Sequence, residues 1–337
     1  MPTSERRLAR HDGSRTGPHH SASHSASQSA SHSASHSAAP SGPRRPTARA
    51  TGLTVAFAAA LGTWLVWWAM VTTWPGQRVE ERVFETADRF QDVVNHLVEP
   101  VLLLGSPPWL VAGFLAVCGI GLLRRRPAAA SLAAVVILGS NLTTQVIKDG
   151  VFHRTGLVGE WNRDINTLPS GHVTVVAAAW AALLLVVPRG WRPATALAGA
   201  AATCAMSLAT VADRWHRPSD VVAAVLVVVA WTSLVCAFAP AGWAGPDRAG
   251  PDGAGPAGGG DGAALPVIAL LGTAAVPMAV LSVLAAAATE GRLLATAPWD
   301  DGLTAYLGGL LAVCAISAFG FAVLLWVCRT APGSRRA

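Results

Sequence analysis

Apolar and polar positions in this chain of 337 residues fall into long alternating blocks. Eight apolar blocks are long enough to fill much or all of a membrane hydrocarbon core, which is roughly 30 Å thick. They run from Leu53 to Trp74, Val101 to Leu123, Ala128 to Ile147, Val173 to Val187, Ala194 to Ala212, Val221 to Ala239, Leu265 to Ala288 and Leu303 to Cys328. The pattern predicts an all-α fold, a polytopic transmembrane helical bundle of about eight helices.

Two of these blocks differ from the rest. Gly105 to Pro108 interrupt the second block near its start, and the fourth is short unless Ser170 to His172 already belong to its helix. A full crossing by either one therefore needs flanking residues to join the helix.

A segment between the first two blocks has a different periodicity. Its apolar residues recur at helical spacing among Glu, Asp and Arg, which predicts an amphipathic helix on the outer surface. These residues are Val79, Val83, Phe84, Ala87, Phe90, Val94 and Leu97. Its simplest role is a structural lid or buttress, and a lipid-gating role stays open.

Residues 1–50 contain a Ser-Ala-Ser-His type repeat of period four, from Ser21 to Ala38. Such a segment buries too little apolar surface to offset its chain entropy, so we expect a disordered cytoplasmic tail. Loose metal chelation by its histidines is an alternative to a solvated repeat. The remaining chain divides into a membrane-embedded core (51–240), a flexible Gly/Pro-rich cytoplasmic loop (241–264) and two additional helices with a short basic tail (265–337).

Composition supports a multi-pass protein of the cell membrane, because 52% of residues are hydrophobic and only 13% are charged. The net charge of +6 does not indicate a nucleic-acid partner, since basic residues cluster in the tail and at helix ends. The five cysteines lie in apolar blocks without metal-ligand spacing, so we expect them to be small buried apolar residues.

Arginines collect on one side of the predicted membrane. They are Arg44, Arg45 and Arg49 before the first block, Arg124 to Arg126 after the second, Arg189 and Arg192 after the fourth, and Arg329, Arg335 and Arg336 after the eighth. By the positive-inside rule this side is cytoplasmic. Both termini are then cytoplasmic, and three polar segments lie together on the extracytoplasmic side: Lys148 to Arg154, Pro169 to His172, and His216 to Asp220.

The second segment has the composition of a helix start. Ser170 can cap the helix, Gly171 allows close approach to the backbone, and the unpaired N–H groups attract a dianion. His172, one turn into this positive end, could donate a proton to a leaving oxygen.

The other two segments supply a base, a carboxylate and cations. His216 and Asp220 stand four residues apart, which on a helix start places them on one face. The carboxylate can then hold one imidazole nitrogen and leave the other as a nucleophile. Lys148 and Arg154 would neutralise phosphoryl oxygens. Each of these residues alone could simply lie at the membrane interface, and it is their combination that indicates phosphate chemistry.

These residues resemble the phosphatidic acid phosphatase type 2 superfamily, which also includes the vanadium-dependent haloperoxidases. That family is marked by Lys-x6-Arg-Pro, then Pro-Ser-Gly-His, then Ser-Arg-x5-His-x3-Asp. The second motif is complete at Pro169 to His172, and the third is present in its catalytic half as His216 and Asp220. The resemblance covers about Val101 to Ala239. Counted together with the first helix, which precedes this range, it implies a phosphatase core of six helices.

By resemblance, His216 would be the nucleophile that forms a phosphohistidine, Asp220 its orienting partner and His172 the general acid. The phosphate-binding residues would be Lys148, Arg154, Ser170 and Gly171, and neither a metal nor another cofactor would be required.

Two departures from the family pattern concern its arginines. The first motif is one residue short and lacks the proline, since Thr155 follows Arg154. Where the third motif should have Ser-Arg, the chain has Ala209 and Thr210. Arg214 could supply the missing guanidinium and is added to the phosphate-binding set, with Arg217 as the weaker candidate.

The sequence thus predicts an integral membrane phosphatase that hydrolyses a lipid phosphate or isoprenoid (pyro)phosphate at the extracytoplasmic face. Its partners would be that lipid substrate and the bilayer. Phosphotransfer to an acceptor other than water, a transporter, and a family member that binds phosphate without turnover stay open as alternatives. Haloperoxidases are less compatible, because they are typically not embedded in a membrane.

Overall fold

The computed structural model describes residues 44–158, 165–240, 243, 259–294 and 301–331, all within one compact unit, Pro43–Ala337. The described residues form helices and no strand. The α-helices are α1 (Arg44–Val66), α2 (Trp74–Asp88), α3 (Gln91–Leu103), α4 (Pro107–Leu123), α5 (Pro127–Val146), α6 (Gly171–Val186), α7 (Arg192–Ala212), α8 (Pro218–Phe238), α9 (Gly259–Leu294) and α10 (Asp301–Thr330). Two π-helical turns, η1 (Trp67–Val71) and η2 (Ile147–Val151), extend α1 and α5, and a 3-10 turn, η3 (Arg189–Trp191), precedes α7.

Six helices in the described part of the chain are long and apolar enough to cross a membrane. They are Ala48–Val71, Pro127–Val151, Arg189–Ala212, Pro218–Phe238, Gly262–Gly291 and Gly302–Thr330. Two further apolar helices, Pro108–Leu123 and Gly171–Val186, are shorter. The predicted all-helical fold is therefore confirmed, and six of the eight predicted apolar blocks form helices with the length and composition of a membrane span. The two short helices correspond to the two blocks that the sequence shows as interrupted or short.

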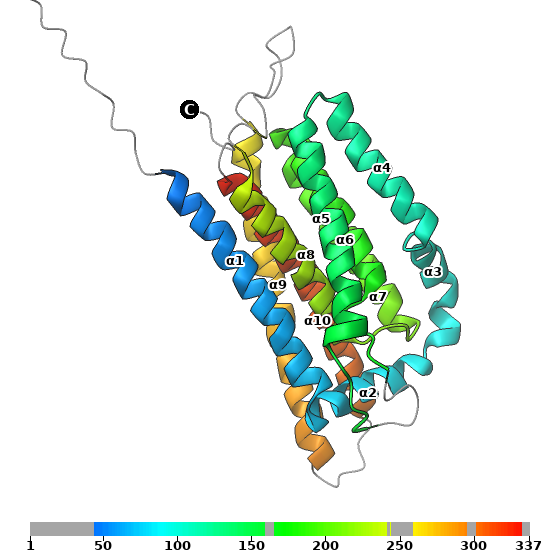
Figure 1. Ribbon diagram of the computed structural model, residues 1–337. Helices are drawn as coiled ribbons and strands as arrows, with labels where there is room; N and C mark the ends of the chain where they lie inside the picture. Colours follow the sequence, from blue (N-terminus) through cyan, green and yellow to red (C-terminus); the bar gives the residue numbers. More distant parts are fainter. Residues whose placement is uncertain (1–43, 159–164, 241–242, 244–258, 295–300, 332–337) are drawn as a thin grey trace, which may run out of the picture. The chain divides into compact units, whose positions relative to one another are not determined.

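Helix α8 lies inside the bundle, where it packs against α1, α5, α6 and α10 (Figure 1). Small residues allow close packing in the bundle: a Cβ at Gly139 of α5 would come within 2.8 Å of the Trp231 ring of α8, and one at Gly199 of α7 would collide with the Phe321 ring of α10. Helix α10 packs against α7, α8 and α9, so the two C-terminal helices are part of the same bundle.

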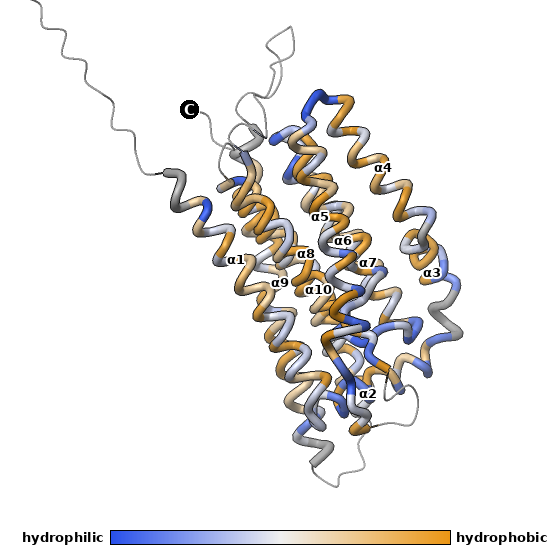
Figure 2. The backbone as a smooth tube through the Cα atoms, in the orientation of Figure 1, coloured by the Kyte–Doolittle hydropathy of each residue, from blue (hydrophilic) through white to orange (hydrophobic). Residues whose placement is uncertain are grey.

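Hydrophilic residues gather at the two ends of the bundle, and one of these ends contains α2, the end of α5 and the start of α8 (Figure 2). The start of α1 and the end of α10 lie at the other end (Figure 1). The structure thus places the three polar segments predicted to carry the chemistry at a common end of the bundle.

The predicted amphipathic helix is present, but it is divided into α2 and α3 by a turn at Arg89–Phe90. Its buried face contains Val83 and Phe84 as expected. The same face also contains two polar residues, Gln77 and Glu80, which are 0% and 3% exposed. Helix α2 therefore brings polar groups to the end of the bundle as well as apolar cover.

The predicted tail and loop fall mostly outside the described residues. Of the tail (1–50), residues 44–50 are described and form the first turns of α1, and of the loop (241–264), residues 259–264 begin α9.

Candidate functional site

His216 lies in the tight turn between α7 and α8. The carbonyl oxygen of Thr210 accepts hydrogen bonds from the backbone N–H of Trp215 (3.0 Å) and of His216 (3.1 Å), and Arg214 adopts a φ of 59°, in the left-handed region. The chain therefore reverses directly after α7 and brings His216 to the start of α8.

Asp220 holds His216 through the cap of α8. The helix begins at Pro218, and the Asp220 carboxylate reaches back to accept a 3.0 Å hydrogen bond from the Arg217 N–H. The same oxygen, Oδ2, lies 3.1 Å from His216 Nδ1. The predicted contact is present, although its cause differs from the prediction. His216 precedes the helix, so the contact depends on the cap and not on one face of a helix.

Asp220 also ties two separate segments together. Thr167 Oγ1 donates a 2.7 Å hydrogen bond to Asp220 Oδ2, and the Asp220 carbonyl oxygen accepts from the Ser170 N–H at 2.9 Å. Asp220 is 2% exposed. The start of α8 is thereby fixed against the start of α6, and Nε2 of His216 is the nitrogen left for chemistry.

The start of α6 has the predicted cap. Ser170 Oγ accepts a 3.4 Å hydrogen bond from the Val173 N–H, and the Ser170 carbonyl oxygen accepts from Thr174 Oγ1 at 2.7 Å. A Cβ at Gly171 would have a single near neighbour, Gln145 Nε2 at 3.7 Å. Gly171 therefore leaves room beside the backbone at a helix start, a position that favours anions.

His172 and His216 face each other across this helix start. Their ring centroids are 6.2 Å apart, and the His172 ring also contacts Trp215 edge-on at 5.0 Å. Gly105, between α3 and α4, backs His172 so closely that a Cβ there would lie 2.7 Å from its Cδ2 atom. The spacing of the two rings suits a tetrahedral phosphoryl group between them.

Lys148 lies in η2, at the end of α5, and is half-buried. Asn166 Nδ2 donates to the Lys148 carbonyl oxygen and to that of Leu168, both at 3.1 Å. This amide therefore holds η2 against the chain that leads into Pro169, and Asp220 acts electrostatically on the Lys148 ammonium.

Arg154 is buried beside a carboxylate. Its Nη1 atom lies 3.8 Å from Glu80 Oε2, and the two side chains are 3% and 4% exposed. Burial lowers the pKa of Arg154, and the neighbouring Arg217 lowers it further. Burial, with a smaller effect from Asp220, raises the pKa of Glu80 from 4.5 to about 7.

The two arginines near the turn are placed differently. Both guanidinium groups lie over the Phe84 ring, at 4.6 Å for Arg214 and 5.2 Å for Arg217. Arg214 pairs with Asp88 at the protein surface. Arg217 is 3% exposed, its Nη1 lies 3.5 Å from Thr167 Oγ1, and its Nε and Nη2 make no hydrogen bond among the described residues. Arg217 is thus the arginine whose side chain lies toward Thr167 and Asp220.

Glu80, Asn166 and Thr167 are site residues that the sequence analysis did not identify. Glu80 shares a helix face with Val83 and Ala87, and an acidic residue on an apolar face was a sign of a buried role. Asn166 and Thr167 directly precede the Pro-Ser-Gly-His motif, where a polar pair needs a partner if it is buried.

No set of three or more His, Cys, Asp or Glu side chains within the described ranges is grouped to hold a metal ion. Comparisons with family models, with curated proteins and with solved structures find no match for this chain. The residues and their geometry are therefore the basis for inferring a function.

Proposed function

We propose that the protein is an integral membrane phosphatase that hydrolyses a lipid phosphate or isoprenoid (pyro)phosphate through a phosphohistidine on His216. The observation that supports this most is the contact of His216 with Asp220 at 3.1 Å, made in front of the α6 N-terminus and opposite His172. This arrangement combines a held nucleophile, an anion site and an acid.

In the first step, His216 Nε2 attacks phosphorus and the bond from phosphorus to the lipid oxygen breaks. His172 gives its proton to that oxygen, so the lipid leaves as an alcohol or, from a pyrophosphate, as a monophosphate. In the second step water attacks the phosphohistidine, His172 takes the proton from the water, and inorganic phosphate leaves. Asp220 stabilises the positive charge on His216 in both steps.

The transferred group carries charge on three oxygens, which the N–H groups of α6 and the nearby cations neutralise. Lys148 and Arg154 are two of these cations. For the third, Arg217 is better placed than Arg214, because Asp88 already pairs with Arg214. We retain Arg214 as the alternative that mutagenesis can separate.

The bundle supports a lipid substrate. The site lies at one hydrophilic end of a set of helices with membrane-spanning length and composition, where a headgroup would sit while its chain remains in the bilayer (Figure 2). The arginine distribution supports an extracytoplasmic position for this end.

The direct test is phosphate release by the purified full-length protein in detergent, with a panel of lipid and isoprenoid phosphates, with and without EDTA. We expect release that EDTA does not abolish and that His216→Ala removes. A matched control is His153→Ala, which alters an exposed histidine near the same end of the bundle. Absence of release from every substrate, or a fully active His216→Ala protein, would overturn the proposal.

A further inference from the structure

Glu80 joins the amphipathic helix α2 to the anion site. Its Oε1 accepts a 3.1 Å hydrogen bond from the Ser219 N–H in the first turn of α8, and its Oε2 lies 3.8 Å from Arg154 Nη1. Because 3.8 Å is too long for a hydrogen bond, the second contact is an ion pair alone. A buried carboxylate thus lies beside Arg154, one of the cations proposed to bind the phosphoryl group.

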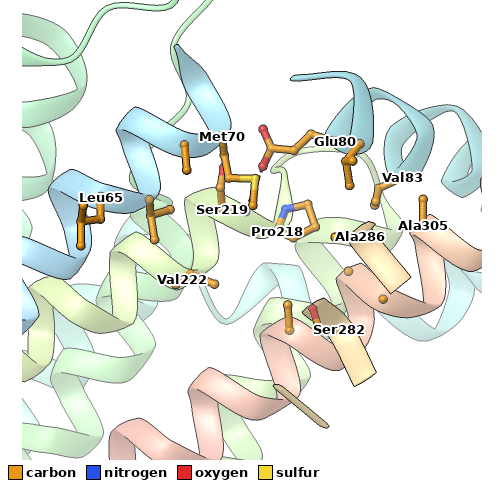
Figure 3. A pocket seen from close by; sticks show the side chains of 16 residues that line it. Leu65, Met70, Glu80, Val83, Pro218, Ser219, Val222, Ser282, Ala286 and Ala305 are labelled. Carbon is orange, nitrogen blue, oxygen red and sulfur yellow. Dashed lines mark hydrogen bonds between the residues drawn. The ribbon is translucent and has the colours of Figure 1, made fainter. Parts of the chain in front are cut away.

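The surroundings of Glu80 are asymmetric. The charged groups acting on it are Asp220 and Arg217 from the start of α8 and Arg154 from the chain after η2. On its other side is an apolar pocket of about 310 Å³, and Figure 3 shows Glu80 near Pro218 and Ser219 in its wall. The residues that α9 and α10 contribute to this pocket are uncharged: Ser282, Ala286, Ala305, Gly308, Gly309 and Ala312.

This asymmetry makes the Glu80 charge depend on what the site holds. An ionised carboxylate in such a place is stabilised by the cations on the site side and opposed by burial and by Asp220. The result is a pKa of about 7, so both protonation states are populated near neutral pH. A bound dianion would add negative charge next to Asp220 and draw on the same cations, which favours the protonated state.

We propose that Glu80 takes up a proton when a phosphate dianion binds: it is the counter-ion of Arg154 in the empty site and becomes neutral when the phosphoryl group takes that place. The proton comes from solvent, Arg154 stays charged, and Glu80 forms no bond to phosphorus. Glu80 is therefore a positioning residue that couples anion affinity to pH. The inference rests on the proposed anion site, but not on turnover.

The test is the affinity of the full-length protein for sulfate between pH 6 and pH 8.5, measured by thermal shift at constant ionic strength. Sulfate remains a dianion over this range, so its own titration does not contribute. Above pH 7 we expect wild-type affinity to fall up to about tenfold per pH unit more steeply than that of Glu80→Gln. Every other titratable group is common to the two proteins, so its contribution cancels in this difference. Glu85→Gln, an exposed change on the same helix with a side chain 47% exposed, should behave as wild type.

Glu80→Asp provides a second test that does not depend on the folding of Glu80→Gln. It keeps a charge but moves it, so the pH dependence should persist with a shifted midpoint. A Glu80→Gln protein with the wild-type slope, a Glu80→Asp protein with an unshifted midpoint, or a wild-type protein that binds no sulfate would each overturn the inference. Glu80-dependent sulfate binding without phosphate release from any lipid would instead overturn the proposed hydrolysis alone.

Discussion

Thr167 Oγ1 donates a 2.7 Å hydrogen bond to the Asp220 oxygen that also contacts His216. Thr167→Val removes this bond and keeps the shape of the side chain, so the carboxylate should hold the imidazole less firmly. Hydrogen bonds to charged groups contribute about 1.5–3 kcal/mol, which corresponds to a loss of roughly 10- to 100-fold in kcat. Steady-state kinetics check this, with Thr167→Ser as the control that should retain most activity. Equal activity of the valine and serine variants would show that the bond does not matter for turnover.

His172 should matter in proportion to the basicity of the leaving oxygen. A lipid alkoxide needs a proton as it leaves, whereas a nitrophenolate does not. His172→Asn should therefore lower kcat/KM, which reports the first step alone, by roughly 10² to 10⁴ for a lipid phosphate and much less for p-nitrophenyl phosphate. The measurement is kcat/KM for both substrates in wild type and variant. The same loss with both leaving groups would contradict the role of general acid.

The two arginines at the turn should respond differently to substitution by lysine. An ammonium cannot reproduce a bidentate contact with phosphoryl oxygens, so Arg217→Lys should lower kcat/KM by roughly 10- to 100-fold. Arg214→Lys should change it little, because Arg214 is partnered by Asp88. If Arg214→Lys is the damaging change and Arg217→Lys is not, the third cation is Arg214, as the sequence alone suggested.

Glu80 should also make stability depend on pH. Its pKa is raised from 4.5 to about 7 in the folded protein, so the folded state holds this proton more tightly than the unfolded state. Its contribution is therefore favourable at low pH and is lost as the pH rises from 4.5 through about 7. The glutamine in Glu80→Gln cannot ionise. The free energy of unfolding of this variant should therefore exceed that of wild type at pH 8 by on the order of 1–3 kcal/mol, with little difference at pH 4.5. Thermal unfolding at the two pH values measures this, and a variant less stable than wild type at pH 8 would contradict it.

Single-cysteine labelling tests the predicted sidedness. Thr155 and Arg124 are exposed at opposite ends of the bundle. In a background without the native cysteines, an impermeant reagent added to intact cells should modify Thr155→Cys and leave Arg124→Cys unmodified. The reverse pattern would place the candidate site in the cytoplasm.

Much of the fold could be predicted from the chain because each membrane helix corresponds to a continuous apolar block in the sequence. A long apolar block must form a helix when its backbone groups lie in hydrocarbon. The same reasoning fails for α4, whose start is determined by Gly105 to Pro108, and for α6, whose start depends on the Ser170 cap. In both cases the residues at the start of the helix, and not its apolar content, determine where it begins and therefore how long it is.

The site was predictable to the extent that its residues form short motifs. The four consecutive residues from Pro169 to His172 mark a helix start, so its cap could be expected. Glu80 could not, because its role depends on Ser219 and Arg154, which are distant in the sequence. The choice between Arg214 and Arg217 depends on Asp88 and Thr167 in the same way. Contacts across long sequence separations decide these roles.

The proposed mechanism requires that His216 becomes covalently phosphorylated during turnover. The most direct measurement is rapid quenching of the purified protein during turnover of a radiolabelled lipid phosphate, followed by identification of the labelled residue under conditions that preserve phosphohistidine. We predict an acid-labile phosphate on His216 that appears faster than phosphate is released and is absent from His216→Ala. Turnover with no label on His216 in wild type, or undiminished turnover by His216→Ala, would contradict the account.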